Sequence, residues 1–454
     1  MRPLWQRGCQ SASAGDNGGV NRENGEGAGR GAAEGTRGAE GGARGGGLGV
    51  AAGGAGLLGS RSRNTALVLD LLRTAGAEGI SRLELAERTG LTPQAVSKIT
   101  ARLRAEGLAA EAGRRASTGG KPRTVLRLVP GAWHAVGVHL DRDELRAVLV
   151  DLEGTVLGER RTPLDLGAGA PTVLEGVARA AGELAADVLG APAGDLAGAP
   201  ALLGLGVALP GPLDHVRGVL HRVTGFPEWD GFPLRDALAR RLGVPVVVDK
   251  DTNAAALGLA VAGVCAGEEA PAPGRGASGA VRASGAVGGG PAGGRPDGGG
   301  SFAYLHLGTG LGAGLVIGGT VHRGARTGAG EFGHQVVQLD GPPCTCGGRG
   351  CVEALCLAAV ARGDLAGAAR VLGTGAANLA GLLDIDLVLL GGRTVAAAPE
   401  AFVAGVGAVL DARARREGGH EGAVPVRIAP GAPHGVARGA AQLLLAPLFG
   451  RDDA

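Results

Sequence analysis

The sequence is short of aromatic residues, of lysine and of long apolar runs. Phe, Trp and Tyr make up only 2% of its 454 residues, so a folded core has to be built from Ala, Val and Leu. Lysine occurs only at positions 98, 121 and 250, and arginine supplies nearly all the positive charge. No apolar run reaches the length of a membrane span, and the first residues lack the apolar core of a signal peptide. We therefore expect no membrane partner.

Cysteine is also scarce. Six cysteines, three of them in a motif that could bind a metal, fit a protein of the reducing cytoplasm better than a disulfide framework. The length predicts two or three domains, and 90 glycines predict disordered tracts within it.

Two segments lack the composition of folded structure. Residues 1–60 are mostly Gly, Ala, Arg and Glu, and residues 267–300 are mostly Gly, Ala, Pro and Ser. Such segments bury too little apolar surface to offset the entropy of ordering. We expect a disordered tail at 1–60 and a disordered insertion at 267–300.

Residues 61–128 carry the pattern of a helix-turn-helix with a β-ribbon. Val68, Leu71 and Leu72 recur at helical spacing. A capping box at 81–84 begins a second helix that we expect to run through Glu87. Thr92-Pro93 begins a third, with Thr as N-cap and Pro in the first turn. Strands at 108–111 and 124–128, with a tip at 117–123, predict the ribbon, or wing.

This segment is strongly basic. Residues 61–128 hold thirteen Arg and Lys against six Asp and Glu, a net charge of +7 in a chain of net charge +2. Such a concentration is typical of a module that binds duplex DNA; the alternative is a helical interaction domain with a solvated basic face. The side chains predicted to face DNA are Thr92, Gln94, Ser97, Lys98, Arg102, Lys121 and Arg123.

One His and three Cys form the sharpest motif. His334, Cys344, Cys346 and Cys351 supply the nitrogen and sulfur donors that Zn²⁺ takes in tetrahedral sites, and the glycines between them let the chain fold back. Four protein ligands leave no open position, so the spacing predicts a structural zinc. The alternatives are unpaired thiols or a Cys344–Cys346 redox pair.

The same residues carry a resemblance. Gly330-Glu331-Phe332-Gly333-His334, followed by the Cys-x-Cys-Gly-x-x-Gly-Cys-x-Glu of residues 344–353, resembles the signature of the ROK family of repressors and sugar kinases. The resemblance covers residues 129–449 and implies an α/β fold of two actin/hexokinase-like lobes with a sugar cleft between them. The basic segment before it resembles the winged helix-turn-helix that ROK repressors carry.

Site residues follow from the resemblance by position. It implies sugar contacts from Asp251, Glu331, His334 and Glu353, and the zinc ligands already named. Gly308, Thr309, Gly310 and Gly312 resemble the second phosphate loop of the kinases, within a Gly-rich turn that we expect to reach Gly314. Asp251 falls on the catalytic base of the kinases.

The chain departs from the kinase pattern at the first phosphate loop. Where ROK kinases show Asp-x-Gly-Gly-Thr, this chain has residues 139–143, His-Leu-Asp-Arg-Asp. Two carboxylates replace groups that hold an anion, and phosphoryl transfer depends on such positioning. Lys250 stands where the family has an Asn, and we expect it to pair with its neighbours Asp249 and Asp251.

We expect a DNA-binding regulator, a repressor, controlled by a sugar and without catalytic residues, Asp251 being a vestigial base. Helix-turn-helix proteins read paired half-sites, so a homodimer or homotetramer is expected. The alternatives are an ATP-dependent sugar kinase, similar to glucokinase or an N-acyl-hexosamine kinase, and a regulator that no longer binds its effector. We also expect few helical turns between Glu353 and residue 376.

Overall fold

A computed structural model describes residues 62–115, 123–264 and 300–451, except 193, 222, 224, 419–422 and 432. The predicted tail at 1–60, nearly all of the predicted insertion and most of the wing tip, including Lys121, lie outside the described residues. Among the residues that are described, no helix combines the length and apolarity needed to span a membrane.

The first described part is a winged helix-turn-helix. Its elements are α2 (Arg63–Thr74), β1 (Ile80–Ser81), α3 (Arg82–Thr89), α4 (Pro93–Ala105), β2 (Ala109–Arg115) and β3 (Arg123–Leu128), with the strands in the order β1-β3-β2. The predicted caps are confirmed: Ser81 and Glu84 form a capping box, and Thr92 accepts the Ala95 N–H. Helix α3 runs two residues past Glu87, and β2 is longer than predicted because it stays paired with β3 as far as Arg115.

A five-stranded sheet follows. It consists of β4 (His134–Leu140), β5 (Glu144–Asp151), β6 (Val156–Pro163), β7 (Leu202–Leu209) and β10 (Val246–Lys250), in the order β10-β7-β4-β5-β6. Helices α5 (Ala170–Leu189) and α6 (Leu234–Leu242) pack against it through buried Val, Leu and Ala side chains. A small hairpin, β8 (Leu213–Asp214) with β9 (Val219–Leu220), lies between β7 and α6 in the chain.

The second sheet repeats the first. Its strands are β11 (Phe302–Leu307), β12 (Leu311–Ile317), β13 (Thr320–Val321), β14 (Leu387–Gly391) and β15 (Val426–Ile428), in the order β13-β12-β11-β14-β15. In each sheet an antiparallel three-strand meander is extended by two parallel strands. The two sheets define two lobes of an α/β fold.

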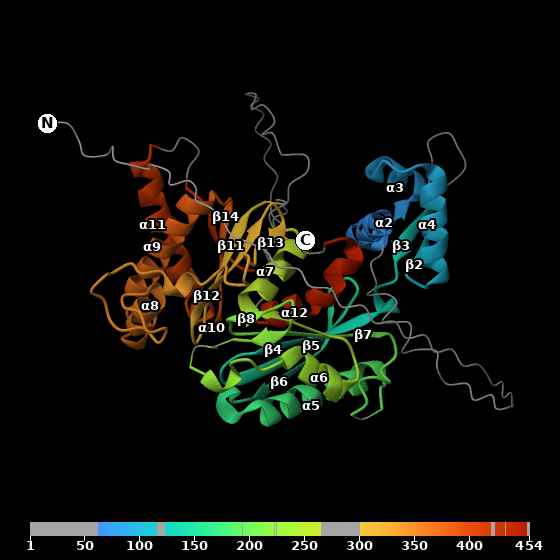
Figure 1. The fold of residues 1–454 in the computed structure, drawn as a ribbon. Helices are drawn as coiled ribbons and strands as arrows, with labels where there is room; N and C mark the ends of the chain where they lie inside the picture. The colour runs from blue at the N-terminus through green and yellow to red at the C-terminus, as the bar shows by residue number, and fades with distance from the viewer. Residues whose placement is uncertain are drawn as a thin grey trace, which may run out of the picture. The chain divides into compact units, whose positions relative to one another are not determined.

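Helices of the second lobe correct one expectation. Helix α8 (Val352–Ala361) starts directly after Cys351, and α9 (Leu365–Leu383) follows after three residues. The chain between Glu353 and residue 376 is therefore almost wholly helical, and the expectation of few helical turns there is wrong. Helix α9 lies beside α11 (Pro399–Arg416), and the short α10 (Arg393–Ala397) follows β14 (Figure 1).

In each lobe, the helix that follows the last parallel strand packs against the sheet of the other lobe. Helix α7 (Asp251–Val261) follows β10 of the first sheet but packs on β12 and β11, whereas α12 (Gly435–Leu445) follows β15 of the second sheet but packs on β4 and β7 (Figure 1). Gly137 and Gly206 make this contact possible, because a Cβ at either position would collide with the backbone of α12. The core is made of Ala, Val and Leu, as the composition predicts.

The winged helix-turn-helix is seated on the end of α12. Val68, Leu69 and Leu72 of α2 share one apolar cluster with Leu445 and with Phe449 of the 3₁₀ turn Ala446–Phe449. The Arg73 guanidinium lies 5.2 Å from the centre of the Phe449 ring, and Arg451 pairs with Asp70 at 3.4 Å.

Candidate functional site

One cavity between the lobes gathers residues from distant parts of the sequence. It encloses about 80 Å³. The four predicted sugar contacts all line it: Asp251, Glu331, His334 and Glu353. Thr309, Gly310 and Gly312, from the predicted second phosphate loop, line it as well. Gly308 forms the turn beside it, donating its N–H to the Gly310 carbonyl at 2.9 Å.

Lys250 is a buried cation of this cavity, which Arg142 also lines. Only 4% of its side chain is exposed, and Nζ donates to Glu331 Oε1 at 2.8 Å and to the Ala329 carbonyl at 2.9 Å. The expectation that Lys250 pairs with Asp249 and Asp251 is wrong. Asp249 is instead bound by Arg323 at 2.7 Å, since successive side chains of strand β10 point to opposite faces.

Two carboxylates of the cavity are held by backbone N–H groups. Glu353, in the first turn of α8, accepts the Leu311 N–H at 2.8 Å through Oε2 and is buried. Asp251 begins α7 and accepts the Thr252 N–H at 2.7 Å. Each keeps a second oxygen that can accept a hydrogen bond from a hydroxyl.

His334 connects the cavity to the cysteine cluster. Its Nε2 lies 4.0 Å from Glu331 Oε2, on the side of the cavity, while Nδ1 lies 3.8 Å from Cys344 Sγ. A metal-bound imidazole presents its other nitrogen as an N–H donor, so metal binding at Nδ1 would fix Nε2–H toward the cavity.

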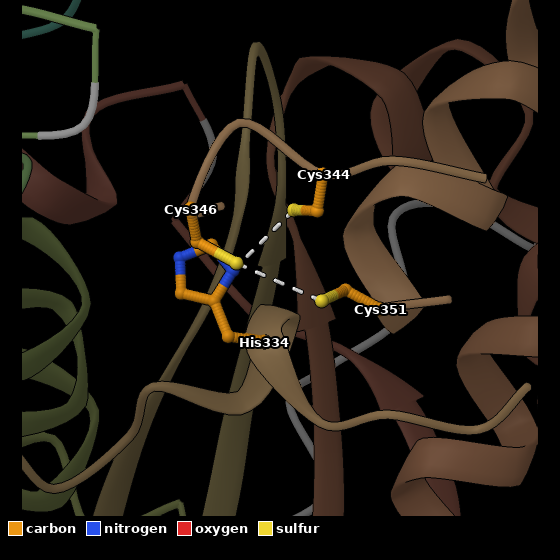
Figure 2. Close-up of side chains that lie close together, drawn as sticks. All are labelled: His334, Cys344, Cys346 and Cys351. Carbon is orange, nitrogen blue, oxygen red and sulfur yellow. Dashed lines mark hydrogen bonds between the residues drawn. The ribbon is translucent and has the colours of Figure 1, made fainter. Parts of the chain in front are cut away.

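The His and Cys side chains converge on one point (Figure 2). One ligand atom from each of His334, Cys344, Cys346 and Cys351 lies within 4.8 Å of the others. Cys346 and Cys351 Sγ are 3.7 Å apart. A tetrahedral zinc with Zn–S bonds of about 2.3 Å places two sulfurs about 3.8 Å apart, whereas a disulfide needs about 2.05 Å. The donors and their spacing therefore fit a metal ion.

The backbone beside Cys346 favours the thiolate form of that residue. The Gly348 N–H lies 3.4 Å from Cys346 Sγ and lowers the pKa of that thiol. A thiolate is the form that binds a metal.

At residues 139–143, which stand where kinases have their first phosphate loop, the two carboxylates are bound by other side chains of the protein. Arg393, at the start of α10, pairs with Asp141 at 2.5 Å and with Asp143 at 2.6 Å, and Thr309 donates to Asp141 at 3.0 Å. Burial opposes ionisation of Asp141, but the nearby His139 and the Arg393 hydrogen bond lower its pKa to about 2. A second cavity of about 210 Å³, mainly apolar, lies on the other side of Asp141 and has Arg393 and Leu390 in its wall.

The predicted DNA-facing residues share one side of α4. Gln94, Ser97 and Lys98 are exposed there, and Thr92 is exposed at the N-cap. Arg102 is exposed too, but its guanidinium donates to Thr65 Oγ1 at 2.6 Å and pairs with Glu106 at 3.6 Å. Arg123, exposed, begins β3 of the wing.

Sequence reasoning missed the partners of the charged residues. Arg393 and Arg323 were not among the predicted site residues, and neither contact has a local signal, since their acidic partners lie 250 and 74 positions away.

The comparisons with known proteins define the class. The pattern described as "ROK family" matches residues 135–297 and 292–360, and the pattern "Winged helix-turn-helix DNA-binding" matches residues 68–109. The chain belongs to the ROK family and carries an N-terminal winged helix-turn-helix domain.

Among its relatives are named regulators. The chain is 26% identical to the xylose repressor of Bacillus subtilis over 275 residues, 60% of this chain and 61% of that protein. It is 28% identical to the DNA-binding transcriptional dual regulator NagC of Escherichia coli over 292 residues, 64% of this chain and 62% of that protein. The matches thus span about three fifths of these relatives.

A solved structure confirms the fold. The crystal structure of a ROK family transcriptional regulator, a homologue of the E. coli MLC protein, superposes with a TM-score of 0.59 at 18% identity, over 86% of this chain and 97% of that one.

Proposed function

We propose that this protein is a DNA-binding transcriptional regulator, a repressor, whose operator affinity is controlled by a sugar or sugar derivative bound between the lobes. The supporting facts are a basic winged helix-turn-helix, relatives named as a repressor and as a transcriptional dual regulator, and a cavity lined by hydroxyl-binding groups. The operator-binding face is the exposed side of α4, with Thr92, Gln94, Ser97, Lys98 and Arg102, and the wing, with Lys121 and Arg123.

The cavity supports sugar binding without phosphoryl transfer. Asp251, Glu331, His334 and Glu353 offer acceptors and a donor to hydroxyls. The observation that carries the proposal is the Arg393–Asp141–Asp143 contact, which puts two carboxylates and a bound guanidinium where a kinase needs groups that hold phosphate. A nucleotide would have to displace this contact and then meet two negative charges.

A structural zinc completes the sugar side of the cavity. We expect His334, Cys344, Cys346 and Cys351 to hold it as a closed four-ligand site. The ion would fix the loop that carries Glu331 and His334 and the start of α8 that carries Glu353. It takes no part in a reaction in this proposal.

Two copies of the chain are expected to act together. Winged helix-turn-helix regulators read paired half-sites, and two-fold symmetry in the protein matches two-fold symmetry in the operator. Sugar binding that changes the angle between the lobes would change the spacing of the two seated DNA-binding domains.

The test begins with duplexes selected by the full chain from a random-sequence pool. Operator affinity is then measured with D-xylose, D-glucose, N-acetylglucosamine and their 6-phosphates or 5-phosphates, each in turn. We expect at least one unmodified sugar to change the affinity. If the protein selects no duplex, the regulator proposal is wrong; if it selects one and no sugar acts, the chain is a regulator that no longer senses.

The kinase alternative is tested in the same panel with MgATP. We expect ATP consumption at background for every sugar. Turnover that is abolished by Asp251→Asn would establish the kinase reading, because only transfer to a sugar hydroxyl requires that carboxylate as a base.

A further inference from the structure

Three loops of the two lobes meet at one point beside the sugar cavity. Asp141 and Asp143 follow β4 of the first sheet. Thr309 follows β11, and Arg393 and Thr394 follow β14, both in the second sheet. The Arg142 N–H donates to Asp141 Oδ1 at 2.8 Å within the first lobe. The contacts that Arg393 and Thr309 make with the two acids all cross from one lobe to the other.

The Arg393 guanidinium donates hydrogen bonds to two carboxylates at once, those of Asp141 and Asp143. Nη1 donates to Asp143 Oδ2 at 2.9 Å and Nη2 to Asp143 Oδ1 at 2.6 Å, while Nη2 also reaches Asp141 Oδ2 at 2.5 Å. Two parallel N–H···O bonds to one carboxylate are the strong form of this ion pair, and the planar guanidinium is built to make them.

Two threonines extend these contacts. Thr309 Oγ1 donates to Asp141 Oδ1 at 3.0 Å, so Asp141 is bound from the second lobe by two residues. Thr394 Oγ1 donates to the Gly308 carbonyl at 3.3 Å, which ties the loop of Arg393 to the loop of Thr309. The side chains of Arg393, Asp141, Asp143 and Thr309 thus form one connected network, which Thr394 joins through the backbone of Gly308.

The network has the opposite polarity to a phosphate site. A phosphate loop presents donors to an anion, whereas this loop presents two carboxylates and receives a cation. We propose that Arg393 is the resident ligand of this inverted loop and acts as a clasp, which holds the two lobes together in the absence of nucleotide and of effector.

The clasp would set the resting equilibrium of the cleft. Arg393 is 45% exposed and Asp143 60% exposed, so solvent screens the contact and its effect is modest. Removing exposed but bidentate contacts of this kind should raise the ratio of the open to the closed cleft about three- to tenfold. A sugar that closes the lobes would then act on a cleft already biased toward closure.

The experiment is hydrogen exchange, followed by mass spectrometry, on the full chain without ligand. Arg393→Gln and Asp143→Asn are compared with wild type and with the double variant, in peptides covering 139–146 and 391–397. Asp143 lines neither cavity, so its substitution leaves the binding sites intact. Arg160→Gln is the matched control, since Arg160 also bridges two carboxylates, Asp187 and Glu183, but within the first lobe.

We expect each single substitution to speed exchange about three- to tenfold in both peptides, including the one on the lobe that was not altered. The double variant should exchange no faster than either single variant, and Arg160→Gln should leave both peptides unchanged. The clasp proposal would be overturned if the exchange rate changed only in the peptide that carries the substitution. It would also be overturned if the rate increases of the two single variants multiplied in the double variant. Because no sugar or DNA is present, this outcome is independent of the proposed function.

Discussion

The buried ion pair between Asp249 and Arg323 offers the sharpest test of what joins the lobes. Asp249 lies in β10 of the first sheet and Arg323 follows β13 of the second. Only 1% of the Asp249 side chain and 7% of the Arg323 side chain are exposed. Asp249 accepts from Arg323 at 2.7 Å, from Asn253 Nδ2 at 3.0 Å and from the Lys250 N–H at 2.7 Å. Both carboxylate oxygens thus accept hydrogen bonds, and Arg323 is the cationic partner.

Arg323→Met removes the cation and keeps the bulk. Leaving a buried carboxylate without its partner costs about 3–5 kcal/mol. With a urea m value of about 3 kcal/mol/M, that loss lowers the unfolding midpoint by about 1–1.7 M. The control Arg217→Met breaks a 4.0 Å pair with Asp214 on a side chain that is 80% exposed, and should cost less than about 0.5 kcal/mol.

The assay is urea unfolding followed by tryptophan fluorescence, for both variants and for Asp249→Asn combined with Arg323→Met. The combined variant should regain part of the lost stability, because the cost comes from the uncompensated charge. A loss below about 1 kcal/mol for Arg323→Met, or no recovery in the combined variant, would refute the reasoning.

Three further predictions follow from other parts of the molecule. Pure, untagged protein should hold one zinc per chain by elemental analysis, and Cys346→Ser should lower this to well under one and reduce solubility. Lys98→Ala should weaken operator binding and reduce the slope of log affinity against log salt by about one, measured by fluorescence anisotropy. Burial lowers the pKa of His134 and of His139. Below about pH 6.5 the unfolded chain therefore binds more protons at these histidines than the folded chain does. The free energy of unfolding should fall as the pH drops from 7 to 5, by up to about 1.4 kcal/mol per pH unit for each histidine. His139→Gln should flatten that fall in urea titrations.

The part of the site that was predictable from the sequence is the part encoded locally. The helix caps at Ser81 and Thr92 depend on residues three positions apart, and the structure has them as predicted. The gathering of His334 with the three cysteines likewise depends on one loop of eighteen residues, counted from 334 to 351. Such short-range patterns can be read without a fold.

Charge partners were not predictable, because the topology decides them. Lys250 has acidic neighbours on both sides, yet Glu331, 81 positions away, binds it. Strand β10 turns Asp249 to the opposite face from Lys250, and Asp251 has already entered α7. Proximity in the sequence therefore gave the wrong partners.

The glycines of residues 308–314 show a second limit. The expected turn reaches Gly314, but β12 begins at Leu311 and includes Gly312 and Gly314. A Cβ at Gly314 would collide with the backbone carbonyl of Thr252 in α7. Glycine at that position serves the close approach of a helix, and a sequence alone does not separate this role from a turn.

The exchange of helices between the lobes has a consequence for synthesis. The first sheet is complete at Lys250, but the face that α12 covers stays open until residues 435–445 leave the ribosome. The apolar seat of the winged helix-turn-helix, at Leu445 and Phe449, is made later still. During synthesis the winged helix-turn-helix is therefore made long before the apolar surface on which it docks. Translation through Phe449 thereby becomes a condition for the docking of this domain on the two lobes.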